Sequence, residues 1–99
     1  MGIFGNRKNI DDEVAAYRTT EGAALIDVRS ADEFAGGHIP GAINLPLDQI
    51  QSIDLPADTP LFVYCHSGMR AGSAVKWLEA HGYSAQNIGG MMNYNGPVE

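Results

Sequence analysis

The segment 65–70 holds the residue types whose spacing could do chemistry: Cys-His-Ser-Gly-Met-Arg. Cys65 is the only cysteine of the chain. A helix that begins near Gly68 or Met69 leaves its first amide groups without partners inside the helix, and these amides attract an anion. Gly68 permits positive φ, so that successive amides can converge on one atom. We therefore expect the loop to hold Cys65 as a nucleophilic thiolate.

The neighbours of Cys65 allow more than one interpretation. Arg70 carries a fixed charge on a planar fork that suits an oxyanion, so we expect it to bind an anionic substrate. His66 either lines the loop or points to water. Ser67 is expected to cap the helix or shape the loop, because nothing indicates a Ser-His-Asp arrangement. The alternative for Cys65 itself is a buried structural thiol.

The sequence contains no motif for binding a metal ion or a cofactor. The three histidines lack ligand spacing and Cys65 has no second thiol, so we predict no metal site and no cofactor. A papain-like Cys/His pair is possible on composition alone. It would need a histidine oriented by a third group, and nothing indicates one.

Secondary-structure patterns place this loop between a strand and a helix. Residues 61–64 are a clear strand, and the apolar positions of 69–81 follow helical spacing. Ser30 and Glu33 have the spacing of a capping box, which predicts a helix over 31–35. Asn9 is a good N-cap for a first helix. Further elements are expected as strands at 24–28, 42–45 and 86–88 and a short helix at 47–53, with a turn at 89–90.

The alternation of these elements predicts an α/β domain with a mainly parallel sheet. Ligands of such sheets bind beyond the carboxyl ends of the strands, which is where Cys65 falls. The 99 residues fit one domain, 1–99, in which 1–8 are expected to form a flexible N-terminal segment. We expect Met91 and Met92 to be core residues, whereas Met69 is as well suited to a pocket wall.

Composition and charge exclude several classes of function. The net charge is −6 and no cluster of Lys and Arg exists, which argues against nucleic-acid binding and against an acidic membrane surface. No stretch approaches the roughly 20 apolar residues of a membrane span. A single cysteine suits a reducing compartment, so we expect a cytoplasmic protein. Beyond Arg29 the only basic residues are Arg70 and Lys76, and this favours a small anion near Cys65.

Three blocks of sequence resemble the single-domain rhodaneses, a family of sulfurtransferases. The first comprises the Leu-Ile-Asp-Val-Arg of 25–29, the Glu-Phe of 33–34 and the Gly-His-Ile-Pro-Gly-Ala-Ile-Asn-Leu-Pro of 37–46. The second is the Val-Tyr-Cys-His-Ser-Gly-Met-Arg-Ala of 63–71. The third is weaker and comprises Gly89, Gly90 and the segment 94–98. Together they span nearly the whole chain.

The resemblance implies a rhodanese-like three-layer α/β domain and a double-displacement reaction. Cys65 would take the outer sulfur of an anionic donor (thiosulfate, a persulfide or a polysulfide) as a persulfide. Cyanide or a thiol, including that of a thiol-bearing protein, would then accept it. The donor would be bound by the loop residues, and three further residues would support the site structurally. The loop residues are His66, Ser67, Gly68, Met69 and Arg70, and the supporting residues are Asp27, Arg29 and His38.

Loop length separates the activities found on this fold. Four residues stand between Cys65 and Arg70, which resembles the sulfurtransferases, whereas related phosphatases have five and a wider cradle. His66 departs from the family's commonest pattern, in which a cation often stands there, so thiosulfate is expected to bind weakly. The alternatives are a non-catalytic interaction domain of the same fold and a phosphatase or arsenate reductase of the same loop family.

Overall fold

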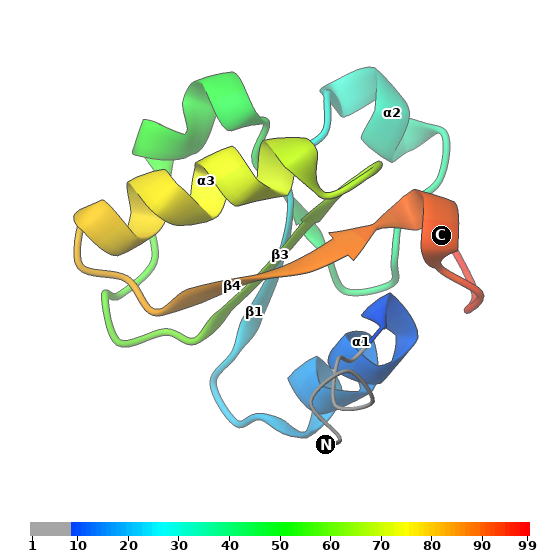
Figure 1. Cartoon of the computed structure of the whole chain (residues 1–99), viewed down its shortest axis with the longest axis horizontal. Helices are drawn as coiled ribbons and strands as arrows, with labels where there is room; N and C mark the ends of the chain where they lie inside the picture. Colours follow the sequence, from blue (N-terminus) through cyan, green and yellow to red (C-terminus); the bar gives the residue numbers. More distant parts are fainter. Residues whose placement is uncertain (1–8) are drawn as a thin grey trace, which may run out of the picture.

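A computed structural model describes residues 9–99 of the chain, and the prediction for 1–8 lies outside the described residues. In this part of the chain, four parallel strands form one sheet in the order β2-β1-β3-β4. Helices and 3-10 turns connect them (Figure 1). The strands are β1 (Ala24–Asp27), β2 (Ile43–Asn44), β3 (Leu61–Cys65) and β4 (Ala85–Gly90). The helical elements are α1 (Ile10–Thr19), α2 (Ala31–Ala35), η2 (Leu47–Ser52), α3 (Met69–Ala80) and η3 (Met91–Asn93).

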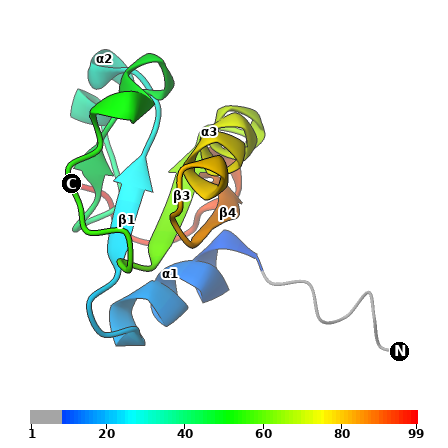
Figure 2. The same cartoon turned by 90° about the vertical axis from the view of Figure 1, so that its left-hand side faces the viewer.

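The sheet has a separate apolar core on each face. On one face Leu25 and Phe62 pack with residues of α1, and on the other Ile26 and Val63 pack with residues of α3 and η2. Successive residues of a strand point to opposite faces, and the central strands are buried on both. Figure 2 shows α1 on one side of β1 and β3, and α3 on the other. The predicted three-layer α/β fold is confirmed.

Local capping fixes where two of the helices begin. The Asn9 side chain accepts a hydrogen bond from the amide of Asp12, which caps α1. Ser30 and Glu33 form the predicted capping box, with the Ser30 amide donating to Glu33 at 2.9 Å. As a result α2 has the predicted bounds. It lies beyond the carboxyl ends of β1 and β3, near the start of α3 (Figure 1).

The last strand is longer than predicted. Gly89 and Gly90, expected as a turn, belong to β4 and pair with Tyr64 and Cys65. A register shift between Val63 and Tyr64 makes this pairing possible. A Cβ at Gly90 would overlap the carbonyl oxygen of His66, so glycine is what lets the strand run beside the loop. The prediction of a turn at 89–90 is therefore wrong.

Candidate active site

The Cys65 sulfur lies at the carboxyl end of β3, within hydrogen-bonding distance of two main-chain amides. Its Sγ accepts from the Gly68 amide at 3.0 Å and from the Ala71 amide at 3.3 Å. Cys65 is the last residue of β3 rather than the first of the loop, and it is 1% exposed. Two donors aimed at one sulfur stabilise that sulfur as an anion or as the end of a short anionic chain.

The turn into α3 produces this geometry. Gly68 has φ +101°, the left-handed conformation that glycine adopts without strain, and it stands at the N-cap of α3. Its carbonyl accepts from the Gly72 amide at 2.9 Å, which begins the helical hydrogen bonding. Ser67 Oγ accepts weakly from the Met69 amide at 3.4 Å, so the serine has a local loop role.

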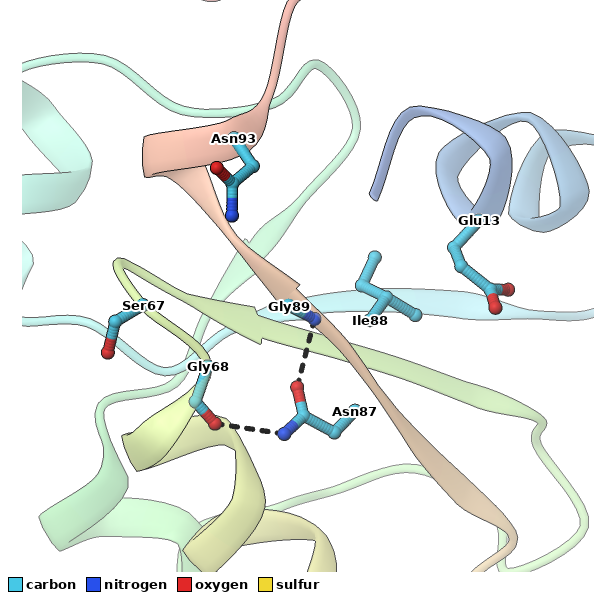
Figure 3. A pocket seen from close by; sticks show the side chains of 7 residues that line it. All are labelled: Glu13, Ser67, Gly68, Asn87, Ile88, Gly89 and Asn93. Atoms are coloured by element: carbon cyan, nitrogen blue, oxygen red, sulfur yellow. Dashed lines mark hydrogen bonds between the residues drawn. The ribbon is translucent and has the colours of Figure 1, made fainter. Parts of the chain in front are cut away.

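The edge strand β4 braces the loop from its other side. Asn87 donates from Nδ2 to the Gly68 carbonyl at 2.9 Å and accepts from the Gly89 amide at 2.9 Å (Figure 3). The Met92 amide donates to the His66 carbonyl at 3.1 Å. Sequence reasoning missed Asn87. The available signal was an asparagine two residues before a glycine, the spacing of an Asx turn.

Arg70 binds a carboxylate of the protein itself. Its Nη1 lies 2.7 Å from Glu33 Oε1, and its Nη2 lies 3.1 Å from Glu33 Oε2. The hydrogen bond from Arg70 is the largest of the causes that lower the pKa of Glu33 to about 2, and the hydrogen bond from the Ser30 amide is the next largest. The hydrogen bond to Glu33 raises the pKa of Arg70. Sequence reasoning gave Glu33 a capping role and a place in the first block of the resemblance, but not a pairing with Arg70, which lies 37 positions farther along the chain.

Asp27 and Arg29 form a buried pair at the end of β1. Arg29 donates to both carboxylate oxygens of Asp27, with its Nε 3.0 Å from Oδ1 and its Nη2 2.7 Å from Oδ2. The same Nη2 donates to the Gly37 carbonyl at 2.7 Å. Desolvation opposes the charge of Arg29, but the hydrogen bond and charge of Asp27 outweigh it, and its pKa is raised. These contacts fix the connections around α2 and do not reach the segment 66–70.

His38, the third predicted supporting residue, makes its hydrogen bonds with α2 and with the last described residue. Its Nδ1 is 2.9 Å from the Phe34 carbonyl, and its ring stacks on that of Phe34 with 3.7 Å between centroids. Two backbone hydrogen bonds join His38 to Glu99. The structure therefore uses His38 to hold α2 and the end of the described chain together.

The remaining loop side chains project outward. His66 is exposed, and Met69 is 81% exposed. Met91 is half-buried and packs in the core beside α1, as predicted. Met92 is 60% exposed, so its prediction as a core residue is wrong. The cause is η3, which turns the chain after β4 and directs the Met92 amide toward the loop.

Two hollows flank the loop. The first, of about 470 Å³, is polar and lies between the loop, β4 and α1; Figure 3 shows Ser67, Gly68 and Asn87 at its edge. The second, of about 480 Å³, is mostly apolar and adjoins Arg70. Its other lining residues are Val28, Ser30, Pro46, Leu47 and Asp48.

Within residues 9–99, no three His, Cys, Asp or Glu side chains gather as a metal site. Of the helices that the structure describes, none has the length and apolar character to cross a membrane.

Comparison with known proteins supplies the family. The model of the rhodanese-like domain matches residues 11–96. Uncharacterized protein YqhL of Bacillus subtilis is 38% identical over 89 residues, covering 86% of this chain and 68% of that protein. Thiosulfate sulfurtransferase GlpE of Pseudomonas entomophila is 37% identical over 81 residues, covering 78% of this chain and 72% of that protein.

A solved structure agrees with these sequence matches. A rhodanese-related protein from Thermoplasma volcanium superposes with a TM-score of 0.80 at 26% identity, covering 93% of this chain and 95% of the other. The chain belongs to the family of rhodanese-like domains.

Proposed function

We propose that the protein is a sulfurtransferase that carries a sulfane sulfur on Cys65. The observation that carries the proposal is the pair of amides, from Gly68 and Ala71, at 3.0 and 3.3 Å from Sγ. Relatives named as sulfurtransferases support the general class of activity. The same amides that stabilise an anionic sulfur before the reaction can stabilise the outer sulfur of a persulfide after it.

The reaction follows from this geometry in two displacements. The Cys65 thiolate attacks the outer sulfur of the donor, the sulfur–sulfur bond of the donor breaks, and sulfite or a thiolate leaves. An acceptor such as cyanide or a thiol then attacks the outer sulfur of the Cys65 persulfide and regenerates the thiolate. Because the chain has one cysteine, no resolving thiol of its own can discharge the persulfide.

Two features favour this activity over the other functions of the fold. The cysteine is retained with amides directed at it, which a purely structural interaction domain does not need. Four residues separate Cys65 from Arg70, which makes a small cradle suited to one sulfur atom rather than a phosphate group. A reducing compartment, for which we propose the cytoplasm, would supply thiols as acceptors.

Intact-mass spectrometry tests the proposal. Purified protein is incubated with thiosulfate, inorganic polysulfide or glutathione persulfide, freed of donor and weighed. We expect a gain of one sulfur atom that is absent in Cys65→Ser, with Ser73→Ala, at an exposed position of α3 outside the loop, as the control that still gains it. No gain with any of the three donors would contradict the proposed function.

A further inference from the structure

Within residues 9–99, Arg70 is the only arginine of the loop, and it is already paired with a carboxylate. The inference drawn from this pairing rests on the proposed function. Arg70 presents both terminal nitrogens to the two oxygens of Glu33, so that the two charges offset each other. Both side chains remain 38–39% exposed, which places the pair at the surface where a substrate arrives. A bidentate pair of this kind leaves little net positive charge to attract an anion.

Within residues 9–99 no other cation replaces Arg70. Arg29 is held by Asp27, and Arg18, on α1, donates to the Pro40 carbonyl. Lys76 lies six residues farther along α3, about 9 Å from Arg70 along the helix axis, and is exposed. The described surface around the loop is therefore neutral to acidic.

The hollow beside Arg70 has the opposite character from an anion site. It has a volume of about 480 Å³, and Val28, Pro46 and Leu47 contribute its apolar lining. Asp48 adds a negative charge at its edge. Elements η2 and α2 and the start of α3 lie together beyond the carboxyl ends of β1 and β3 (Figures 1 and 2). This apolar lining is suited to burying an organic group.

We propose that Glu33 is a specificity-determining residue: by holding Arg70 it makes this site favour sulfur donors with an apolar organic group over the thiosulfate dianion. A small alkyl persulfide carries at most one negative charge, and its alkyl group fits the apolar hollow. The carboxylate of Glu33 is ionised at neutral pH, and the hydrogen bonds from Arg70 and the Ser30 amide lower its pKa further, to about 2. The pairing therefore persists throughout the physiological range.

Both donors complete the same balanced transfer. With thiosulfate, the bond between its two sulfur atoms breaks, sulfite leaves with the electron pair, and Cys65 becomes a persulfide. With an alkyl persulfide, the alkyl thiolate leaves instead and takes up a proton from water. Neither reaction needs an oxidant or a reductant. The two donors therefore undergo the same chemistry, and they differ in their charge and their apolar surface. These are the two properties that the site is proposed to distinguish.

The test compares donor kinetics in Glu33→Gln and in Asp32→Asn. Glutamine keeps the capping box, because its side-chain oxygen can still accept from the Ser30 amide. Asp32→Asn removes the same charge one residue away, from an exposed side chain of α2. We expect Glu33→Gln to lower KM for thiosulfate about fivefold, the effect of one exposed unit charge near 4 Å, whereas Asp32→Asn leaves it within about twofold.

Two further measurements keep the result interpretable. The gain should disappear in the double variant Glu33→Gln/Arg70→Met. In Glu33→Gln, kcat/KM for ethyl persulfide should change by no more than about twofold, because this donor carries at most half the charge of thiosulfate. Retained activity with ethyl persulfide also shows that this variant is folded. In the unaltered protein, kcat/KM should rise from methyl to butyl persulfide by up to about fourfold per added methylene.

The outcomes separate this inference from the proposed function. An unchanged thiosulfate KM in Glu33→Gln, or a kcat/KM that does not depend on the alkyl group, would overturn the inference while sulfur transfer itself stands. Absence of transfer from every donor in the unaltered protein would overturn the proposed function instead.

Discussion

Two carboxylate–arginine pairs differ chiefly in burial: one stands just before α2, and the other joins α2 to α3. Asp27 and Arg29 are 0% and 7% exposed, whereas Glu33 and Arg70 are 38% and 39% exposed. The closest nitrogen–oxygen distance is 2.7 Å in both. The two pairs therefore have the same shortest nitrogen–oxygen distance but very different exposure to water.

Burial decides what each pair can contribute. Removing one partner of a buried pair leaves an uncompensated charge away from water, which destabilises the fold strongly. An exposed pair contributes little to stability because water and salt screen it. The buried pair is thus part of the framework, and the exposed pair is free to influence which substrates approach.

The largest expected effect breaks the buried pair. Asp27→Ala should lower the free energy of unfolding by about 3 kcal/mol or more, because the Arg29 guanidinium loses its partner. Urea unfolding followed by circular dichroism measures this loss of stability. The control is Asp32→Ala, which removes an exposed carboxylate three positions after Arg29 in the sequence. A loss of less than about 1 kcal/mol would show that burial does not separate the two pairs.

An intermediate effect is expected where β4 meets the loop. Gly90→Ala places a Cβ against the His66 carbonyl, so the loop or the strand must shift. We expect a loss of about 2 kcal/mol in stability and a clear drop in the fraction of protein loaded with sulfur. Gly36→Ala is the control, since its Cβ would make only ordinary contacts at 3.5 Å or more. Equal loading of both variants would show that loop position does not govern the site.

The smallest effect concerns the exposed pair. Because the pKa of Glu33 is lowered from 4.5 to about 2, its contribution to stability is present above about pH 4.5 and is lost as the pH falls toward 2. We expect the free energy of unfolding of the unaltered protein to exceed that of Glu33→Gln by less than about 1 kcal/mol at neutral pH. That difference should vanish near pH 2 in unfolding curves recorded across this range. A difference that grows on acidification would contradict the assignment.

Short-range patterns explain what could be predicted from the sequence. The capping box of Ser30 and Glu33 spans three residues, and the strand before Cys65 is a compact apolar run, so both were visible in the sequence. The positive φ expected at Gly68 is confirmed. Each of these features depends on neighbours along the chain, where spacing translates directly into geometry.

Long-range contacts explain what could not. The partner of Arg70 is 37 residues away, and Asn87 reaches the Gly68 carbonyl from 19 residues away. Nothing in the spacing reveals such contacts. Gly90 looked like a turn because glycine pairs favour turns, yet close approach of the His66 carbonyl is the reason that a glycine fits there.

The account depends most on sulfur residing covalently on Cys65 between donor and acceptor. The most direct measurement loads the protein with a sulfane donor, removes the donor, confirms the modified Cys65 peptide by tandem mass spectrometry and adds cyanide. We predict about one thiocyanate released per loaded protein, with Cys65 returned to the free thiol. Thiocyanate formation that persists in Cys65→Ser, or a loaded sulfur that cyanide cannot remove, would contradict the account.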